Sequence, residues 1–571
     1  MRFRSLTIYL ATFLVTVMML FGVRAVQREL DAQVAKYRLR YTGDIKNAPP
    51  LVIITTVALG SFRGIIADML WLRAESLKQK HNYYEMVQLA QWITDLQPSF
   101  SGATSYLAWN MAYNISVTCS SPIDRWRWVN EGLKLLRDKA IVYNPDDPRL
   151  YKEIAWIYGH KLGNVMDEAN VYYKNRLAVE MQNIFGRFPD WEKMAAAPVG
   201  REEFLKKHPG TSPIWKNIPG GDPEEKYDRL REAFEKSAPE LPAGFGISDA
   251  GVLDYLRAEL LRERCKLDSR KILDINREYG TLDWRTPEAM AIYWARESIA
   301  HSLINKNKRE INTDRIITHA LYQSFLAGRV MKTDPDLNKE KNIEFVIYPN
   351  LSLVDAVYRT YTEGQTYHDG KDEFQSSFRT ARNNFIKEAV YILSAFGAFN
   401  KAEEYYQLLV KDDGPQKQIL PDGKVVVFRT LAEFAKAEWI ETIKNANAKQ
   451  AQVFLSGLIY CCIVNEVTGN HDMALFYERS ARYVYKYYVE TIGNTPRMEI
   501  PPYDHLKRQV QEWCIEVLPP EQVRRLKSII ADEQAERLQR ERLERAASPR
   551  TDGDRAGQRE TASPPAALPG K

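Results

Sequence analysis

Three residues directly before a predicted helix form the group with the clearest chemical potential in this sequence: Asp283, Trp284 and Arg285. The following run, Thr286–Glu288, is typical of a helix start, because proline is tolerated in the first helical turn. An arginine placed there could clamp a carboxylate through paired N–H groups. In the alternative interpretation, Asp283 and Arg285 pair with each other and pin the loop, while Trp284 packs into the core.

Aromatic and arginine side chains near this loop extend the candidate surface. Such side chains dominate protein interfaces, so we expect a partner to bind here. In the alternative interpretation, which stays open for the tyrosines, aromatic residues at helical spacing pack between helices. The predicted partner-binding residues are Asp283, Trp284, Arg285, Tyr293, Arg296, Tyr405 and Tyr406.

The usual signatures of catalysis and metal binding are missing from the sequence. No pair of the eight histidines has the spacing of a metal site with a nearby carboxylate. The patterns of a phosphate-binding loop, a nucleophile elbow and covalent haem attachment are also missing. The adjacent residues Cys461 and Cys462 lie within the apolar run 453–464, which predicts core packing. We therefore predict no catalytic residue, no cofactor and no metal.

Composition narrows the class of protein. Hydrophobic residues make up 45% and charged residues 27% of the 571 residues, which are globular values. They exclude a wholly disordered chain and a polytopic membrane protein. The net charge of +5 gives no global field for nucleic acid, so no nucleic-acid partner is expected. Five cysteines are too few for a disulfide scaffold.

An uncharged run of 18 residues, Leu6–Val23, follows Arg2 and Arg4. As a helix it would span roughly 27 Å, which is close to the thickness of a bilayer core. A cleaved signal peptide is the alternative, but Arg24 lies inside the only small-residue cleavage pattern. The run predicts a single-pass membrane anchor over residues 1–24.

The orientation of this anchor follows less directly. Counting positive charges on both sides would place the large domain in the cytoplasm. Large domains often cross a membrane regardless of charge, and the start MRFR resembles an export signal. We therefore expect a bacterial inner-membrane protein whose soluble part lies on the outer, periplasmic side.

Helical patterning covers most of the remaining chain. Apolar residues recur at spacings of three and four, and the second apolar run, Leu51–Leu72, is expected to be a core helix because Arg63 and Asp68 interrupt it. The only strand-like piece is Lys424–Phe428, one arm of a small hairpin. The predicted organisation is a linker over 25–47, a helical block over 48–187, a Pro/Gly-rich insertion over 188–247 with one or two short helices, a helical block over 248–500, C-terminal helices over 501–546 and a disordered tail over 547–571.

Short repeated patterns suggest how the helices pair. His81, Tyr83, Tyr84, Glu85, Met86 and Ala90 form one such pattern; Gly397, Phe399, Ala402, Tyr406 and Leu409 form a second; Gly469, His471, Ala474 and Ala481 form a third; and Asp167, Ala169, Tyr173 and Leu177 fit more loosely. In each, a small residue allows two helices to approach closely. These patterns resemble tetratricopeptide-like repeats, and the resemblance implies an all-α fold in which a transmembrane helix precedes an α-solenoid of helical hairpins.

Two further segments, Gly60–Lys78 and Tyr279–Ala295, resemble parts of membrane-anchored repeat proteins of bacterial envelopes. The resemblance implies a scaffold or adaptor that binds a membrane-associated protein or peptide without catalysis. Two alternatives stay open. One is an α/α-toroid enzyme that acts on a glycan through two carboxylates and aromatic platforms. The other is a purely structural envelope component.

Overall fold

The computed structural model describes residues 2–36, 62–80, 82–97, 100–247, 250–304, 310–367, 372–419, 424–435, 437–438, 448–492 and 498–547. It is 76% helix with a few short strands, which confirms the prediction of an all-α protein. The chain divides into two compact units, described separately below. Unit 1 comprises Met1–Ser394 and Ala398–Thr442, and unit 2 comprises Ala395–Gly397 and Ile443–Lys571. The predicted block 248–500 is therefore divided between them.

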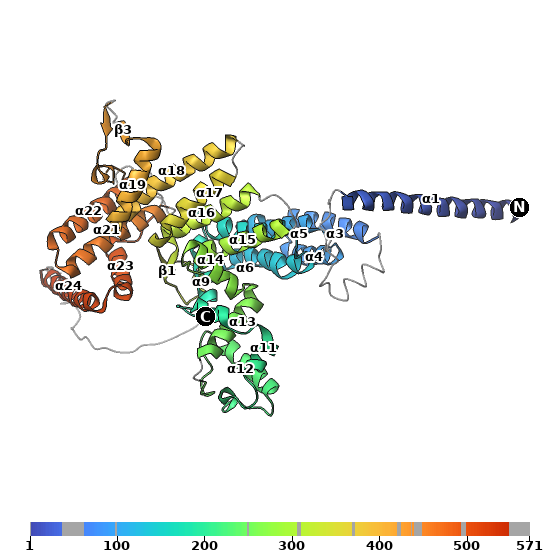
Figure 1. Ribbon diagram of the computed structural model, residues 1–571, viewed down its shortest axis with the longest axis horizontal. Coiled ribbons are helices and arrows are strands. Elements are labelled where there is room, and N and C mark those ends of the chain that lie inside the picture. Colours follow the sequence, from blue (N-terminus) through green and yellow to red (C-terminus); the bar gives the residue numbers. More distant parts are fainter. Residues whose placement is uncertain are drawn as a thin grey trace, which may run out of the picture. The chain divides into compact units, whose positions relative to one another are not determined.

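Unit 1 begins with α1 (Arg2–Lys36), an unbroken helix of 35 residues (Figure 1). At about 1.5 Å per residue it is roughly 52 Å long, which exceeds a bilayer core of about 30 Å. Large apolar side chains along it are exposed, including Met18, Phe21 and Val26 at 71%, 67% and 67%. The side chains of residues 2–12 lie outside the described part, so the predicted membrane span stays a prediction.

The helices that follow build the centre of unit 1. They are α3 (Phe62–Gln79), α4 (Tyr83–Leu96), α5 (Ser101–Trp109), α6 (Pro122–Lys134), α7 (Ile141–Tyr143), α8 (Pro148–Trp156), α9 (Asn170–Phe185), α13 (Ala250–Cys265), α14 (Ser269–Tyr279), α15 (Pro287–Ile304), α16 (Ile311–Ala327), α17 (Val354–Tyr367), α18 (Asp372–Ala395) and α19 (Phe399–Asp413). Short 3-10 segments are η2 (Ser116–Thr118), η5 (Pro213–Trp215) and η6 (Leu351–Leu353). Side chains cap the starts of α6 and α8. The Ser121 hydroxyl accepts from the Ile123 amide at 3.2 Å, and Asp147 accepts from the Arg149 amide at 3.0 Å.

The helix α15 is the most deeply buried element of this centre. Twelve of its residues are buried, and it packs against both α8 and α16. Figure 1 shows α16 beside it. α16 in turn packs against α17. Because α15 is covered by neighbours along most of its length, side chains near its first turn are held in a fixed position. The candidate site described below depends on that position.

Three π-helical segments interrupt the helices of unit 1. They are η1 (Asn110–Ile115), η3 (Leu135–Ala140) and η4 (Ile157–Leu162), which continue α5, α6 and α8 respectively. A π-turn widens the helix by one residue and is frequent at functional sites. Here η1 carries Tyr113 and η4 carries His160 and Lys161. The Tyr113 side chain contacts both of these residues, so η1 and η4 meet through polar side chains.

The second apolar run predicted to form a core helix is described from Phe62 onward, as α3. One face is buried, with Ala67, Ala74 and Leu77 at 8% exposure or less, and it packs against α4. The opposite face exposes Met69 and Leu72 at 65% and 70%. The expectation of a core helix therefore describes only one face of α3. Residues 51–61 lie outside the described part.

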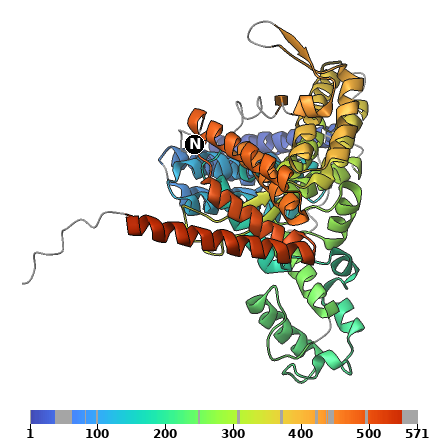
Figure 2. The same ribbon diagram turned by 90° about the vertical axis from the view of Figure 1, so that its left-hand side faces the viewer.

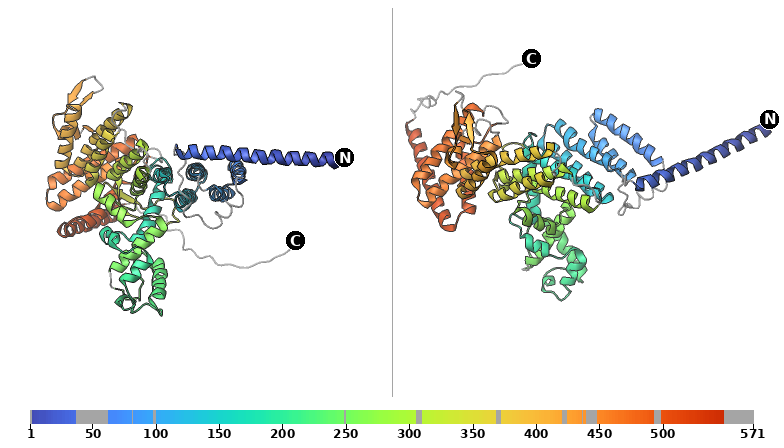
Figure 3. Two further views of the ribbon diagram at one scale, coloured as in Figure 1. Left: turned by 45° about the vertical axis from the view of Figure 1, so that its right-hand side comes forward. Right: turned by 45° about the horizontal axis from the view of Figure 1, so that its top comes forward.

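The Pro/Gly-rich segment 188–247 contains more helix than predicted. It forms α10 (Trp191–Ala196), α11 (Gly200–Lys207) and α12 (Pro223–Ser237), where one or two short helices were expected. Pro213 and Pro223 are the first residues of η5 and α12, and the other prolines of the segment lie between helices, which reconciles their density with helical structure. Figure 3 shows α11 and α12 lying together with α13 (green) in both views.

Two short antiparallel hairpins complete the described part of unit 1. β3 (Lys417–Ile419) pairs with β4 (Val425–Val427), with Gln418 opposite Val426, which confirms the strand expected over 424–428. β1 (Arg329–Lys332) pairs with β2 (Val346–Tyr348), with Val330 opposite Ile347, and was not predicted. Four residues are too few for a clear alternating pattern.

Unit 2 consists of α21 (Ala448–Thr468), α22 (His471–Thr491), α23 (Tyr503–Val517) and α24 (Pro520–Ala547) in its described part. α21 packs against α22 and α23 and buries Phe454 and Leu458 completely. Figure 2 shows α24 as one long helix (dark red), and α23 and α24 agree with the helices predicted over 501–546. The predicted tail lies outside the described residues from 548 onward.

One described helix, α21, is long and apolar enough to cross a membrane, and 67% of its apolar window is buried within the protein. Burial on that scale is typical of a core helix. Of the residues quoted for the repeat pattern, Met86, Ala90, Ala402 and Tyr406 lie on packed helix faces, Tyr84 is 73% exposed on α4, and His81 lies outside the described part. Gly469 has φ +85° between α21 and α22, and Ala474 and Ala481 of α22 are buried. The hairpins agree with the pattern, while a regular solenoid stays a prediction.

Candidate functional site

The loop before α15 is a closed hydrogen-bonded unit. Arg285 donates from Nε and Nη2 to the two Asp283 oxygens at 2.9 and 2.8 Å, from Nη1 to Gln182 Oε1 at 3.0 Å, and from Nη2 to the Val330 carbonyl at 2.6 Å. Asp283 also accepts from the Val330 amide at 2.8 Å. The Asp–Arg pair thus fastens β1 to the loop, and Arg285 is 6% exposed.

The aromatic residues next to this pair are in the core. Trp284 is 1% exposed, donates from Nε1 to Asn276 Oδ1 at 3.0 Å, and meets Tyr293 edge-on at 6.2 Å between ring centroids. Tyr293 is 2% exposed, and its hydroxyl accepts from the Asp268 amide at 3.0 Å. Every polar atom of these two side chains is therefore used inside the protein.

The remaining predicted residues lie apart from that loop. Arg296 pairs with Glu278 at 2.7 Å and is 36% exposed. Tyr405 and Tyr406 are 1% and 2% exposed in α19; the Tyr405 hydroxyl donates to Asp355 at 2.9 Å, and the Tyr406 hydroxyl donates to the Phe428 carbonyl at 3.2 Å. Among the described residues, no hydrogen bond, ion pair or ring contact joins these tyrosines to Trp284 or Arg285.

The expectation that these residues line an exposed groove is therefore corrected. Trp284, Arg285, Tyr293, Tyr405 and Tyr406 are buried, and Asp283 is bound to Arg285. The structural interpretation, in which the Asp–Arg pair pins the loop and the aromatics fill the space between helices, is the one observed. Of the predicted set, Arg296 alone keeps a substantially exposed side chain. The physical reason is that these aromatics occupy inward faces of α15 and α19.

Unit 1 instead contains a cleft of about 690 Å³. Its walls are α8 with η4 and α16, and residues of α15, α17 and α18 complete it. A volume in this range is typical of ligand-binding clefts. The lining residues most relevant to recognition are Glu153, Trp156, His160, Glu288, Arg315 and Tyr361.

One face of the α8–η4 helix forms the first wall. Glu153, Trp156, His160 and Asn164 follow one another at intervals of three or four residues, which places them on the same side of a helix. The facing wall of α16 is built in the same way, by Asn312, Arg315, Ile316, His319, Ala320 and Gln323. Two helical faces rich in amide, imidazole and charged groups thus look across the cleft.

Glu288, in the first turn of α15, is the most deeply buried acidic residue of the cleft. It is 3% exposed and lines the cleft space. Among the residues that the structure describes, its carboxylate has neither a hydrogen bond nor an ion pair. A side chain at Gly163 would place its Cβ only 3.3 Å from Glu288 Oε1, so the glycine leaves room for the carboxylate.

Glu153 adds a second acidic group. Burial raises the pKa of its carboxyl, and the charge of the neighbouring Lys152 opposes the rise without cancelling it. Lys152 itself pairs with Glu310, Nζ to Oε2 at 2.6 Å. A carboxyl whose pKa is raised can exchange protons closer to neutral pH, which is the property of general acids.

His160 stacks on Trp156, with ring centroids 4.6 Å apart and an interplanar angle of 12°. Its Nδ1 lies 3.3 Å from the hydroxyl of Tyr113 on η1. Burial lowers the pKa of His160 below its usual 6.5, and the charge of Lys161 acts in the same direction. The imidazole is therefore mostly neutral at pH 7, and it adds a hydrogen-bonding ring rather than a positive charge.

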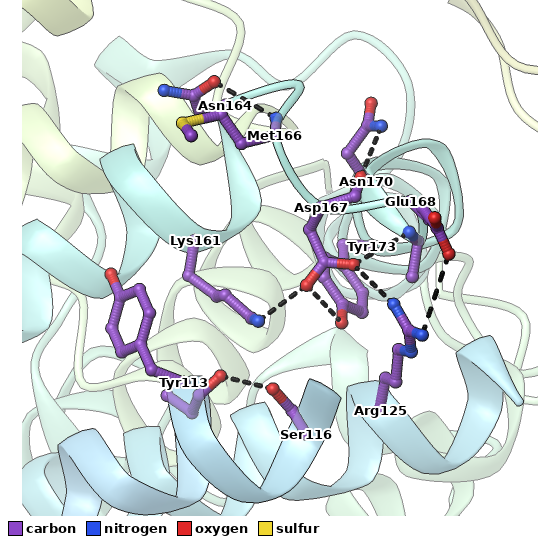
Figure 4. A network of polar contacts seen from close by, with 12 residues as sticks. Tyr113, Ser116, Arg125, Lys161, Asn164, Met166, Asp167, Glu168, Asn170 and Tyr173 are labelled. Atoms are coloured by element: carbon purple, nitrogen blue, oxygen red, sulfur yellow. Dashed lines mark hydrogen bonds and ion pairs between the residues drawn. The ribbon is translucent and has the colours of Figure 1, made fainter. Parts of the chain in front are cut away.

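A buried polar network fixes this end of η4 (Figure 4). Lys161 and Asp167 point toward each other, Nζ to Oδ2 at 2.6 Å, and Asp167 also accepts from Arg125 Nη1 at 3.2 Å and from the Ala169 amide at 2.9 Å. Burial alone would raise the pKa of Asp167, but the bonds from Lys161 and Ala169 outweigh it and hold the pKa below its usual value. Because Lys161 follows His160, the network orients the wall of the cleft.

The cleft combines two carboxyl groups, aromatic rings and amides, so its chemistry is that of binding a cation or a polyhydroxylated molecule. No group of three metal-ligating side chains occurs among the described residues. The sequence analysis missed Glu153, Trp156, His160 and Glu288. Their helical spacing along 153–164 was visible in the sequence, but the pairing of that face with α16, more than 150 residues later, was not.

Comparison of the chain with known protein families, with curated proteins and with solved structures found no match.

Proposed function

We propose that this chain is a binding protein, tethered to a bacterial membrane by α1, which holds part of a protein partner in the cleft between α8 and α16. The observation that carries the proposal is Glu288, a carboxylate that is 3% exposed, faces the cleft and has no partner in the described part of the chain. A buried charge without a partner is costly, so folded proteins keep one where a ligand completes it.

The tether supports the same proposal. The helix α1 is longer than a bilayer core is thick, and the uncharged run Leu6–Val23 lies within it. A tethered protein meets co-anchored partners at high local concentration, so moderate affinity suffices. We place the soluble part on the outer side of the inner membrane, as an adaptor or scaffold of the envelope.

The cleft also favours a second candidate, a glycan-active enzyme. Glu153 has a raised pKa and could act as the general acid, and Glu288 could serve as the second carboxylate. Trp156, at 41% exposure, offers an aromatic face for a sugar ring. This candidate requires turnover, which the adaptor does not.

The membrane tether is tested by fractionation. We expect the full-length chain to stay in the membrane pellet after alkaline carbonate extraction, and a chain lacking residues 2–36 to be released. Protease added to intact spheroplasts should digest the soluble part if it lies outside. Full-length protein recovered in the carbonate supernatant would contradict the anchor.

The cleft is tested by photocrosslinking in cells. A benzophenone amino acid at Asn312, in the cleft, is expected to give a protein adduct, whereas the same group at Glu224, which is 73% exposed on α12, is not. Filling the cleft with Ala381→Trp should remove the Asn312 adduct. An adduct that survives cleft filling would argue against the site, and hydrolysis of a glycan by the purified parent, lost in Glu153→Gln, would favour the enzyme.

A further inference from the structure

The interior of the cleft carries more unmatched negative than positive charge. Glu153 and Glu288 have no hydrogen bond or ion pair to their carboxylates in the described part of the chain. The basic residues of the lining are not bonded to these carboxylates: Lys152 pairs with Glu310, and Arg315 and His319 have exposed side chains. His160 contributes a mostly neutral ring at pH 7.

The position of Glu288 makes a bound cation the natural complement. Glu288 lies in the first turn of α15, and burial removes most of its access to water. Glu288 lines the cleft, and neither of its carboxylate oxygens is among the fully enclosed side-chain atoms without a partner. A donor entering the cleft can therefore reach this carboxylate directly.

The walls around it suit a long basic side chain. Trp156, Tyr361 and Phe378 supply apolar and aromatic surface. The methylene stem of lysine or arginine packs well on such surfaces, and its charged head is attracted to aromatic faces. A guanidinium also matches a carboxylate through two parallel hydrogen bonds.

We infer that the cleft recognises a basic side chain, lysine or arginine, of the protein partner, with its cationic head on the Glu288 carboxylate and its stem against Trp156 and Tyr361. The inference rests on the proposed function, because it names the part of the partner that the cleft binds. Charge complementarity selects this occupant over an acidic or a neutral segment.

The experiment measures binding to the purified full-length chain in detergent by isothermal titration calorimetry. The probes are N-acetylarginine methylamide and its neutral counterpart N-acetylcitrulline methylamide. We expect the charged probe to bind at least tenfold more tightly. Glu288→Gln should reduce that preference to less than twofold, while the matched control Glu278→Gln, an exposed glutamate paired with Arg296, should leave it unchanged.

Each further outcome is decisive. If the parent binds both probes equally, the inference is wrong, and this comparison needs no variant to fold. If Glu288→Gln does not fold by circular dichroism, the cleft-filling variant Ala381→Trp replaces it. A preference for the charged probe that survives in Ala381→Trp would place the probe outside the cleft and reject the inference. Tighter binding of spermidine than of the arginine probe would replace the protein partner by a free polyamine. Binding of triacetylchitotriose but of neither arginine-derived probe would overturn the inference and leave the cleft a ligand site. A crosslinked adduct from Asn312 that survives filling of the cleft would overturn the proposed function itself.

Discussion

Lys161 and Asp167 form an ion pair inside unit 1, with 2.6 Å between Nζ and Oδ2 and exposures of 5% and 7% (Figure 4). The pair lies next to His160, so it holds the wall of the cleft in addition to closing the turn between η4 and α9. A pair at this depth behaves differently from a surface pair, because neither charge can return to water when the other is removed.

We predict that Asp167→Ala lowers the free energy of unfolding of unit 1 by about 3–5 kcal/mol, since it leaves Lys161 buried without its counter-charge. The loss of free energy is measured by urea unfolding in which hydrogen exchange of the α8 and η4 amides is the readout. Glu232→Ala provides the control, because Glu232 and Lys236 are also 2.6 Å apart but are 71% and 73% exposed. Equal effects of the two substitutions would show that burial does not determine the strength of the pair.

The same carboxyl predicts a pH dependence. The pKa of Asp167 is lowered in the folded protein, so its contribution to stability is complete above the unfolded pKa of about 3.9 and is lost as the pH falls through the folded value. The difference in unfolding free energy between the parent and Asp167→Asn should therefore be constant from pH 7 to pH 5 and shrink below about pH 4. Urea titrations at each pH measure it, and a difference that stays constant down to pH 2 would contradict the assignment.

Much of the fold followed from local features of the sequence. Proline and an oxygen-bearing side chain at Ser121–Pro122 and Asp147–Pro148 identify helix starts because the cap is made within three residues. Near the end of the chain, opposite charges alternate at a spacing of four residues, which indicates the exposed helix α24 because such pairs stabilise a helix surface. The hairpin β1–β2 escaped prediction because its strands are too short for alternation to show.

The site was harder to predict because it depends on distant contacts. Trp284 and Tyr405 have the composition of an interface, but the sequence does not reveal that α15 and α19 turn them inward. Glu288 was read as part of a helix start, and only the packing of α15 between α8 and α16 gives its carboxylate a cleft to face. The types of these residues indicated binding chemistry, whereas the packing of the helices determined which of their side chains face the cleft.

Arg285 provides a test that separates structural from binding roles. We predict that Arg285→Ala costs about 3–5 kcal/mol of stability, because Asp283 and the Val330 carbonyl lose their donor. Arg285→Lys should recover less than half, because an ammonium cannot reproduce the forked geometry. Arg296→Ala, at a side chain 36% exposed, should cost less than about 1 kcal/mol.

Thermal and urea unfolding of these three variants measure the costs. If Arg285 has only a structural role, the folded variants Arg285→Lys and Arg296→Ala should still form the partner adduct from a benzophenone amino acid at Asn312. If instead Arg285→Lys were as stable as the parent but lost that crosslink, the loop would act in binding and its hydrogen bonds to β1 would be secondary.

The thiols of unit 2 are predicted to be protected from modification. Cys461 and Cys514 are 3% and 0% exposed, and burial raises the pKa of each thiol to about 12. The Cys461 thiol also donates to the Ala395 carbonyl at 3.0 Å. At pH 8 a thiol with that pKa is a thiolate in about one molecule in ten thousand, and only the thiolate reacts.

We therefore expect maleimide at pH 8 to label Cys461 and Cys514 slowly in native protein and rapidly in urea, as measured by peptide mass mapping over time. Cys119, which is partly exposed in unit 1, serves as the internal comparison and should react faster in the native state. Rapid native labelling of Cys461 would mean that α21 separates from its neighbours on the time scale of the reaction. Because α21 is also the one described helix with the length and hydropathy of a membrane span, slow labelling of its thiols in detergent-free protein would support its placement as the core of unit 2.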